Sequence, residues 1–198
     1  MTTNLIQPMS KEIIPEIRSN YDFYNQLLKE RKSIFEAVIS IEAVGNNKNI
    51  LEKSIEVNHS NYSGNIYLIA SVKRNDINFF QFKLKCKEIC AKPFFRFDSD
   101  GGTHRNYIDG IPLKEQQIPT PHFHLYNQDG LNIAYKTPPL LDDVQKKALE
   151  DISLCLAHFF QESNINPESN TICEVQISPE LLPFHDTSFD PHSNIIFP

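Results

Sequence analysis

The sequence predicts an α+β domain, in which an antiparallel sheet of five to seven strands is packed by an N-terminal helix and a long C-terminal helix. Two patterns predict this class. Residues 54–59, 65–73 and 78–87 have strand-like compositions and are joined by short polar connections, as in an antiparallel meander. Residues 144–162 carry the strongest helical pattern, with apolar side chains along one stripe.

The length of 198 residues indicates one domain with appended ends. We expect a flexible N-terminal arm over residues 1–18, a single α+β domain over residues 19–165, and a C-terminal extension over residues 166–198 that packs on the surface. The chain has 14 Phe and 7 Tyr but no Trp, so phenylalanine must fill most of the core.

The first half of the chain is expected to start with a helix that ends near residue 32, followed by a strand from about residue 34 and a turn at residues 45–49. In the third meander strand, residues 78–87, apolar and polar side chains alternate regularly. This alternation predicts that one face of the strand is buried, the face that carries Phe80, Phe82, Leu84 and Cys86.

The second half is expected to add strands at residues 93–98, 122–126 and 131–136, of which the last two form a hairpin. Asp142 or Asp143 is placed to start the C-terminal helix. Its buried stripe is predicted to consist of Leu149, Ile152, Leu156, Phe159 and Phe160. A last short strand is expected at residues 172–177.

The net charge of −6 argues against broad, unspecific binding of nucleic acids, which needs an excess of basic residues. One group of basic residues could form a local basic patch or simply a solvent-exposed strand face. These residues are Lys83, Lys85, Lys87, Arg96 and Arg105. No run approaches the roughly 20 apolar residues of a membrane helix, and no signal peptide is evident. The four cysteines lack a CxxC pair, which favours free thiols and a cytoplasmic location without membrane partners.

A cluster of ionisable residues between Arg96 and His124 is the strongest indication of a functional site. Arg96 and Asp98 are two residues apart on one predicted strand, and His122 and His124 are two apart on another, so each pair shares a face. His104 follows a pair of glycines, which allow the backbone to approach a ligand closely. We predict that these five residues line one pocket and form its catalytic set.

Three kinds of chemistry fit this cluster. A divalent metal could be held by His104, His122 and His124 together with Asp98 or Asp100. Without a metal or other cofactor, two histidines could act as general acid and base while Arg96 or Arg105 holds a phosphate, an arrangement suited to cleaving RNA. Alternatively, Arg96 pairs with an aspartate and the loop is only a rigid turn.

Further residues near the cluster are candidates for binding a substrate, namely Arg105, Asn106, Tyr126 and Tyr135. Three other histidines are not expected to take part in the site. His158 is expected at the edge of the core, and His185 and His192 are expected to be solvated in the C-terminal extension. Neither a nucleophile elbow nor a phosphate-binding loop is present in the sequence.

The order of these motifs resembles an uncharacterised family of small bacterial domains. The motifs are Arg-x-Asp, Gly-x-x-His-x-Asn, Pro-His-x-His-x-Tyr and Ala-Tyr, followed by a closing helix, and the resemblance covers about residues 50–165. The chain departs from the family's Asn-Pro-Asp-Gly by a longer turn, residues 106–110. In outline it is also similar to toxins of toxin–antitoxin modules that carry a strand-borne histidine pair, which implies a bacterial toxin or phage-defence context.

These observations predict a hydrolase that acts on nucleic acids or nucleotides, such as a toxin-like or defence-related RNase, with RNA or a nucleotide as its partner. The alternative is a non-catalytic protein-binding module, a defence inhibitor or accessory subunit, whose acidic surface recognises a basic protein partner. The acidity of the chain favours the second hypothesis, and the cluster of His, Arg and Asp favours the first. The sequence does not indicate an oligomeric state.

Overall fold

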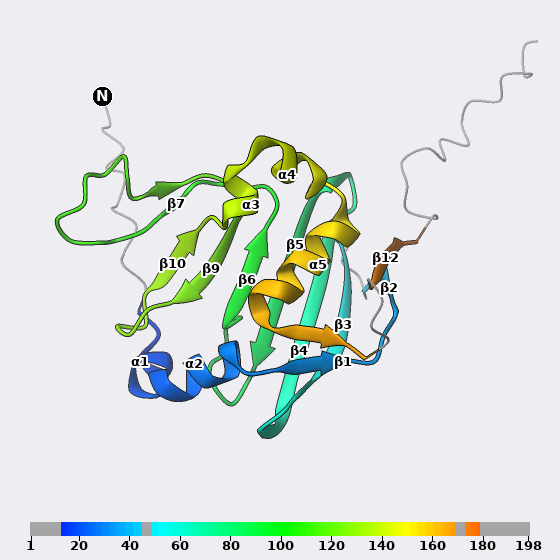
Figure 1. The fold of residues 1–198 in the computed structure, drawn as a ribbon, viewed down its shortest axis with the longest axis horizontal. Coiled ribbons are helices and arrows are strands. Elements are labelled where there is room, and N and C mark those ends of the chain that lie inside the picture. Colours follow the sequence, from blue (N-terminus) through cyan, green and yellow to red (C-terminus); the bar gives the residue numbers. More distant parts are fainter. Residues whose placement is uncertain (1–12, 45–48, 169–172, 179–198) are drawn as a thin grey trace, which may run out of the picture.

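A large, mostly antiparallel sheet forms the centre of the molecule, and this computed structural model confirms the α+β class (Figure 1). The structure describes residues 13–44, 49–168 and 173–178. The main sheet has ten strands, more than the five to seven expected, and most of them follow the order β10-β9-β6-β5-β4-β3-β1-β11. Strand β2 pairs with β3 and with β12 at the side of this path.

The strands of the main sheet are β1 (Lys32–Ile34), β2 (Val38–Ala43), β3 (Ile50–His59), β4 (Tyr62–Lys73), β5 (Asp76–Cys86), β6 (Phe95–Asp98), β9 (His122–Tyr126), β10 (Asn132–Tyr135), β11 (Ile165–Pro167) and β12 (Glu174–Ile177). A separate two-stranded ladder consists of β7 (His104–Arg105) and β8 (Gln117–Ile118). The helices are α1 (Pro15–Ser19), α2 (Tyr21–Lys29), α3 (Pro138–Leu141), α4 (Asp143–Ala148) and α5 (Ile152–Ser163).

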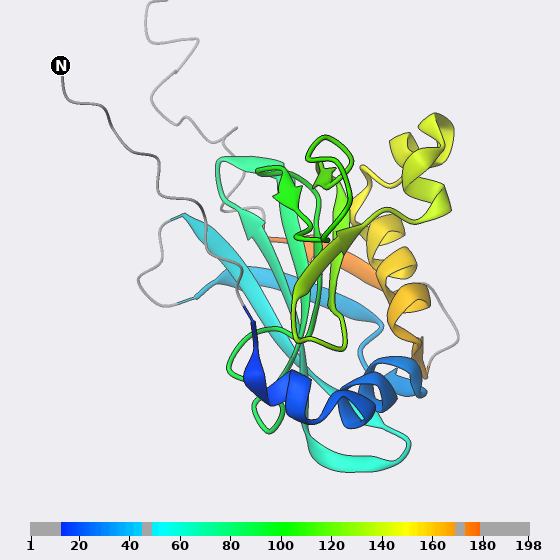
Figure 2. The same cartoon turned by 90° about the vertical axis from the view of Figure 1, so that its left-hand side faces the viewer.

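The predicted meander is present as β3, β4 and β5, paired antiparallel in sequence order. The alternation in β5 gives the expected buried face, because Phe80, Phe82 and Leu84 are all at most 2% exposed. Helix α5 packs on this face and brings Phe159 against the rings of Phe82 and Phe95. Figure 2 shows α3, α4 and α5 on one side of the sheet, and the site described below lies on the other side.

The C-terminal helix is two helices rather than one. Helix α4 ends at Ala148 and α5 begins at Ile152. Asp142 caps α4 by accepting a hydrogen bond from the Gln145 backbone, and Asp151 caps α5 by accepting from two backbone N–H groups. The second cap sets the break, because an aspartate whose side chain binds the next N–H groups starts a new helix. Leu149 and Ile152, expected in the core, are only partly buried at this break.

Parts of both expected extensions belong to the body of the protein. Ile13 forms a β-bridge with Leu131, and Ile17 in α1 is fully buried, so residues 13–18 do not behave as a free arm. At the other end, β11 pairs in parallel with β1, and β12 pairs in parallel with β2, so both strands extend the sheet. Residues 1–12, 45–48, 169–172 and 179–198, with His185 and His192, lie outside the described residues.

The cysteines and the helices also bear on two predictions, free thiols and the absence of a membrane-spanning helix. All four cysteines are free and buried, as expected. Among the described residues, no helix has the length and apolar character needed to cross a membrane.

Candidate active site

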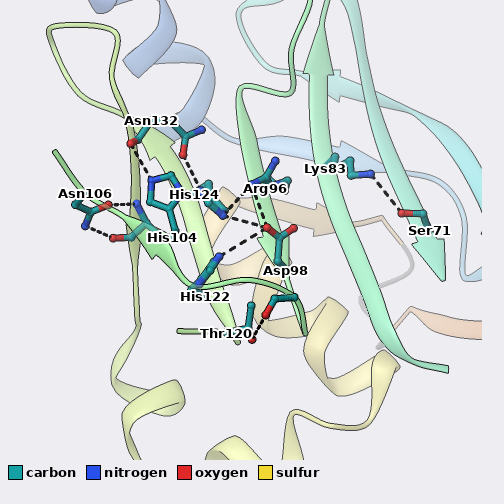
Figure 3. Close-up of polar contacts among 12 residues, drawn as sticks. Ser71, Lys83, Arg96, Asp98, His104, Asn106, Thr120, His122, His124 and Asn132 are labelled. Carbon is teal, nitrogen blue, oxygen red and sulfur yellow. Dashed lines mark hydrogen bonds and ion pairs between the residues drawn. The ribbon is translucent and has the colours of Figure 1, made fainter. Parts of the chain in front are cut away.

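Strands β6 and β9 are antiparallel neighbours, and their register brings the two predicted residue pairs together (Figure 3). Arg96 lies opposite His124, and Asp98 lies opposite His122. Because side chains alternate along a strand, all four point to the face away from α5, while the intervening Phe97 and Phe123 join the core. These four residues therefore share one face, as predicted, but of the five residues expected to line one pocket only Arg96, His104 and His124 do so, because Asp98 and His122 are buried beneath it.

The Asp98 carboxylate is the centre of the cluster. Its Oδ2 lies 3.0 Å from Nη2 of Arg96, 3.0 Å from Nε2 of His124 and 3.7 Å from Nε2 of His122. Burial alone would raise the pKa of Asp98, but its contacts with the two histidines and the charge of Arg96 outweigh burial and lower the pKa well below its usual range. Asp98 is therefore a buried carboxylate that stays ionised.

His124 is fixed at both ring nitrogens. Its Nδ1 lies 2.7 Å from Oδ1 of Asn132, and its Nε2 lies 2.9 Å from Nη2 of Arg96. Nε2 also lies 3.0 Å from Oδ2 of Asp98. A guanidinium can only donate and an ionised carboxylate can only accept, so these two contacts favour opposite protonation states of Nε2, while the oxygen of Asn132 favours a proton on Nδ1. Burial lowers the pKa of His124, and the nearby Arg96 acts in the same direction, whereas contact with Asp98 opposes it. His124 is accordingly neutral, with its ring orientation determined by its neighbours.

His104 reaches the cluster from β7, outside the main sheet. Its ring centroid lies 4.8 Å from that of His124 and 6.3 Å from that of His122. Its Nε2 is 3.2 Å from the backbone oxygen of Asn132, to which Nε2–H can donate, leaving Nδ1 unprotonated. Burial and the neighbouring His124 lower the pKa of His104 to about 4, so at neutral pH the ring is an uncharged base.

A pocket of about 320 Å³ opens above these side chains. Three cations line it, namely Lys92, Arg96 and Arg105, and His104 and His124 form part of its wall. No carboxylate is found among the described residues that line this pocket. In a chain of net charge −6, this local concentration of positive charge is the property of an anion-binding site.

Two of the four predicted substrate-binding residues line the pocket. Arg105 packs its guanidinium over the ring of Tyr107, at 4.6 Å from the centroid, and Tyr126 lies beside His124 on the same face. The Nε–H of Arg105 also donates to Oε1 of Gln116 at 3.2 Å, which holds the side chain at the rim.

The other two, Asn106 and Tyr135, are not among the residues that line the pocket. The buried Asn106 uses its side-chain amide to accept from the backbone N–H of Ala134 at 2.7 Å and to donate to the Ala134 carbonyl at 2.8 Å, so it attaches the loop to β10. Tyr135 lies on the opposite face of the sheet, stacked on Phe123, with its hydroxyl donating to Glu162. Neither side chain lines the pocket, because one is occupied by main chain and the other alternates into the core.

Sequence reasoning missed Asn132, which supports two histidines at once. Its side chain binds Nδ1 of His124 and its backbone oxygen binds Nε2 of His104. A signal was available, since Asn132 is two residues before Ala134 on the hairpin strand and so shares the face of its partner His124. Lys92 and Tyr107 also line the pocket without having been singled out. His158 is a buried histidine bonded to Thr137, as predicted.

The cluster also has the donor set of a metal site. Ligand atoms of Asp98, His122 and His124 lie within 4.8 Å of one another, whereas His104, predicted as a ligand, is not part of this group. Two further atoms are buried without a hydrogen-bond partner among the described residues, Oδ1 of Asp98 and Nδ1 of His122. However, the guanidinium of Arg96 lies 2.9 to 3.0 Å from His124 and Asp98, so a metal would have to displace it. Asp100 is exposed and caps its own turn by accepting from Gly101 N–H.

The fold and the site define an α+β domain with a buried Asp–His–Arg cluster beneath a cationic pocket. The chain belongs to a family of unknown function (DUF6978), whose model matches residues 22–165. This match confirms the resemblance to an uncharacterised domain family, and it includes the whole of the site described above. No curated protein and no solved structure matches the chain.

Proposed function

We propose that this protein is a phosphodiester hydrolase that cleaves RNA, in the manner of a toxin-like or defence-related RNase. One observation carries the proposal: a cationic pocket without a lining carboxylate has two neutral histidines, His104 and His124, on its wall. Such a pocket provides both the charge that binds a phosphate and a base that can remove a proton from an attacking group.

Arg96 is the proposed phosphate clamp. Its guanidinium is anchored by Asp98 and His124 at about 3.0 Å, and about a third of its side chain remains exposed toward the pocket. Arginine presents several N–H groups in a plane, so it can keep a contact with Asp98 while it donates to phosphate oxygens. Arg105 and Lys92 supply further positive charge around the same space.

His104 is the proposed general base. Its Nδ1 carries no hydrogen bond from another described residue, whereas both nitrogens of His124 are engaged. In RNA cleavage, Nδ1 of His104 would take the proton of the attacking 2′-hydroxyl as the P–O bond to the 5′-oxygen breaks, and the departing 5′-oxygen would take a proton from water in the pocket. A bound phosphate favours protonation of neighbouring histidines, so His104 and His124 can differ in protonation within one turnover.

The experiment is a cleavage assay of the purified protein on single-stranded RNA, compared with single-residue variants. His104→Ala and Arg96→Ala are each expected to lower kcat/KM at least about 100-fold, the range in which general bases and charge-stabilising donors contribute. His59→Gln is the matched control, because His59 is another histidine, on β3, far from this pocket in the sheet order. Equal cleavage by wild-type protein and His104→Ala would contradict the proposal.

A metal-dependent version of this activity is supported by the close approach of Asp98, His122 and His124. It predicts that chelation abolishes cleavage, that a divalent transition metal restores it, and that Asp98→Asn prevents this restoration. The metal-free version predicts full activity in chelator. If no RNA or nucleotide is cleaved in either condition, the chain is better described as a non-catalytic module that binds a protein partner.

A further inference from the structure

A row of cations continues from the pocket across the open face of the sheet. Lys83 in β5 lies directly opposite Arg96 in β6, and Lys85 is two residues further along the same strand. On the other side of β5, Lys85 lies opposite Tyr67 of β4. Alternation places all four side chains on the face that α5 does not cover, since the intervening Phe82 and Leu84 are buried on the other face.

We propose that Lys83, Lys85 and Tyr67 form a second subsite, which binds the backbone and one base of single-stranded RNA next to the phosphodiester held in the pocket. The inference rests on the proposed function, and it makes the substrate a polymer rather than a free nucleotide. Strands are spaced by about 4.8 Å, so Lys83 lies two strands and roughly 10 Å from His124, a distance that a neighbouring nucleotide can span.

The charges facing Lys83 favour an anion at this position. Lys83 is half-buried, and its Nζ donates to Oγ of Ser71 at 3.5 Å, the contact drawn in Figure 3. Two cations, Arg96 and Lys85, and two carboxylates, Glu52 and Asp98, act on it. Asp98 is already shared with Arg96 and two histidines, so Glu52 is the main carboxylate that acts on Lys83, and the three cations Lys83, Lys85 and Arg96 outnumber the two carboxylates. A backbone phosphate lying between Lys83, Lys85 and Arg96 would supply the missing counter-charge.

Tyr67 favours single-stranded over double-stranded nucleic acid as the ligand. A half-buried tyrosine on an open sheet face offers a flat ring on which an unstacked base can lie, and only single strands present unstacked bases. The subsite formed by Lys83, Lys85 and Tyr67 ends at Tyr67, because Glu56 of β3 lies opposite Tyr67 and would repel the next phosphate. An acidic protein could satisfy the lysines but would not need the aromatic ring.

The test compares a long with a short substrate in the same protein. Cleavage of a single-stranded oligoribonucleotide of about ten nucleotides is measured against cleavage of a dinucleotide, which has only the scissile phosphate and lacks the second one that the lysines would bind. In the variant Lys83→Gln/Lys85→Gln, the ratio of kcat/KM for the long substrate to that for the short one should fall about tenfold, mainly through KM. Tyr67→Ala should lower the same ratio without changing the salt dependence.

A matched control removes two positive charges elsewhere. Lys53→Gln/Lys147→Gln makes the same change in net charge, but Lys53 is exposed on the other face of β3 and Lys147 is exposed on α4. An equal loss in the control would mean that only net charge matters, and it would overturn the subsite. An unchanged ratio in the Lys83→Gln/Lys85→Gln variant would overturn it as well.

Direct binding separates this inference from the proposed function. Fluorescence anisotropy with the labelled oligoribonucleotide needs no cleavage, and the two lysine substitutions should reduce the slope of log affinity against log salt by about 1.4. If the wild-type protein cleaves nothing but binds the oligonucleotide through these lysines, the subsite stands and the hydrolase proposal fails. If it cleaves RNA and the slope is unaffected, the subsite fails alone.

Discussion

Asn132 determines how the histidines of the site present their nitrogens. With its side-chain oxygen at Nδ1 of His124 and its backbone oxygen at Nε2 of His104, one residue favours a proton at one defined nitrogen of each of two histidines. Asn132→Ala removes only the first of these contacts. We expect it to cost about 1 kcal/mol of unfolding free energy, typical of one hydrogen bond, and to lower kcat more than KM.

The contact between the Asn132 side chain and His124 can be tested separately by measuring the tautomer of His124. Nitrogen-resolved NMR of the imidazoles should show the proton on Nδ1 in the wild-type protein and a mixture in Asn132→Ala. His104 should keep its tautomer, since it binds the backbone of residue 132. An unaltered His124 tautomer in the variant would show that Arg96 alone orients the ring.

The buried histidines predict how stability responds to acid. His104 has a pKa of about 4 in the folded protein, below its ordinary value of 6.5, so between these values the unfolded chain binds more protons. Stability should therefore be greatest above pH 6.5 and should fall as the pH decreases toward 4. Burial lowers the pKa of His124 and His158 as well, and these residues act in the same direction.

The check is a series of denaturant titrations from pH 7.5 to about pH 4. His104→Asn should show a smaller decrease than the wild-type protein, because it lacks one group that is protonated only on unfolding. Asp98 affects stability only at lower pH. Because its pKa in the folded protein is lowered, its contribution to the free energy of unfolding is lost only when the pH falls below the ordinary carboxylate range. A steeper decrease in His104→Asn than in the wild-type protein would contradict this assignment.

At the scale of elements, the phenylalanine core on the α5 side holds the site strands in place. Phe82 is fully buried and contacts the rings of Phe80, Phe97 and Phe159. Phe82→Ala should cost about 3–5 kcal/mol of unfolding free energy, from lost burial and the cavity left behind. A chemical denaturation curve measures it, and a loss below about 1 kcal/mol would be incompatible with the observed packing.

The break between α4 and α5 gives a second test at this scale. Asp151 accepts hydrogen bonds from the backbone N–H groups of Ser153 and Leu154, so Asp151→Ala should cost about 1 kcal/mol. Asp143→Ala is the matched control, because Asp143 lies in the first turn of α4 but is not its cap residue. Equal losses in the two variants would mean that charge near a helix start, rather than the cap, is responsible.

The alternation of side chains along the longer strands explains which parts of the fold and site could be predicted. The period of two in β5, β6 and β9 determines both the core face and the shared face of Arg96, Asp98, His122 and His124. Strands β1 and β11 have only three residues each, too few for a periodic signal, and they pair in parallel with each other across a long stretch of chain. The short strand expected at residues 172–177 is present as β12, but its parallel pairing with β2 could not be read from its own residues. That Asn106 and Tyr135 do not line the pocket could not be predicted, because the attachment of the loop and the phase of the strand depend on long-range pairing.

At the scale of the whole molecule, the sheet separates structural and chemical roles onto its two faces. One face is apolar and covered by α5, and the other carries the cationic pocket and the row of lysines that continues from it. We propose that a phosphodiester lies in this pocket beside His104 and Arg96. An anion in the pocket would stabilise the protonated ring of His104 and so offset the burial and the neighbouring His124 that lower its pKa.

The most direct test is an NMR titration of the histidine rings in the presence of a non-cleavable oligonucleotide with a 2′-deoxy group at the scissile position. Our account predicts that the pKa of His104 rises from about 4 toward neutrality on binding, while that of His59, far along the sheet, does not move. The rise should disappear in Arg96→Ala. A His104 pKa that stays at its free value under saturating oligonucleotide would contradict the account.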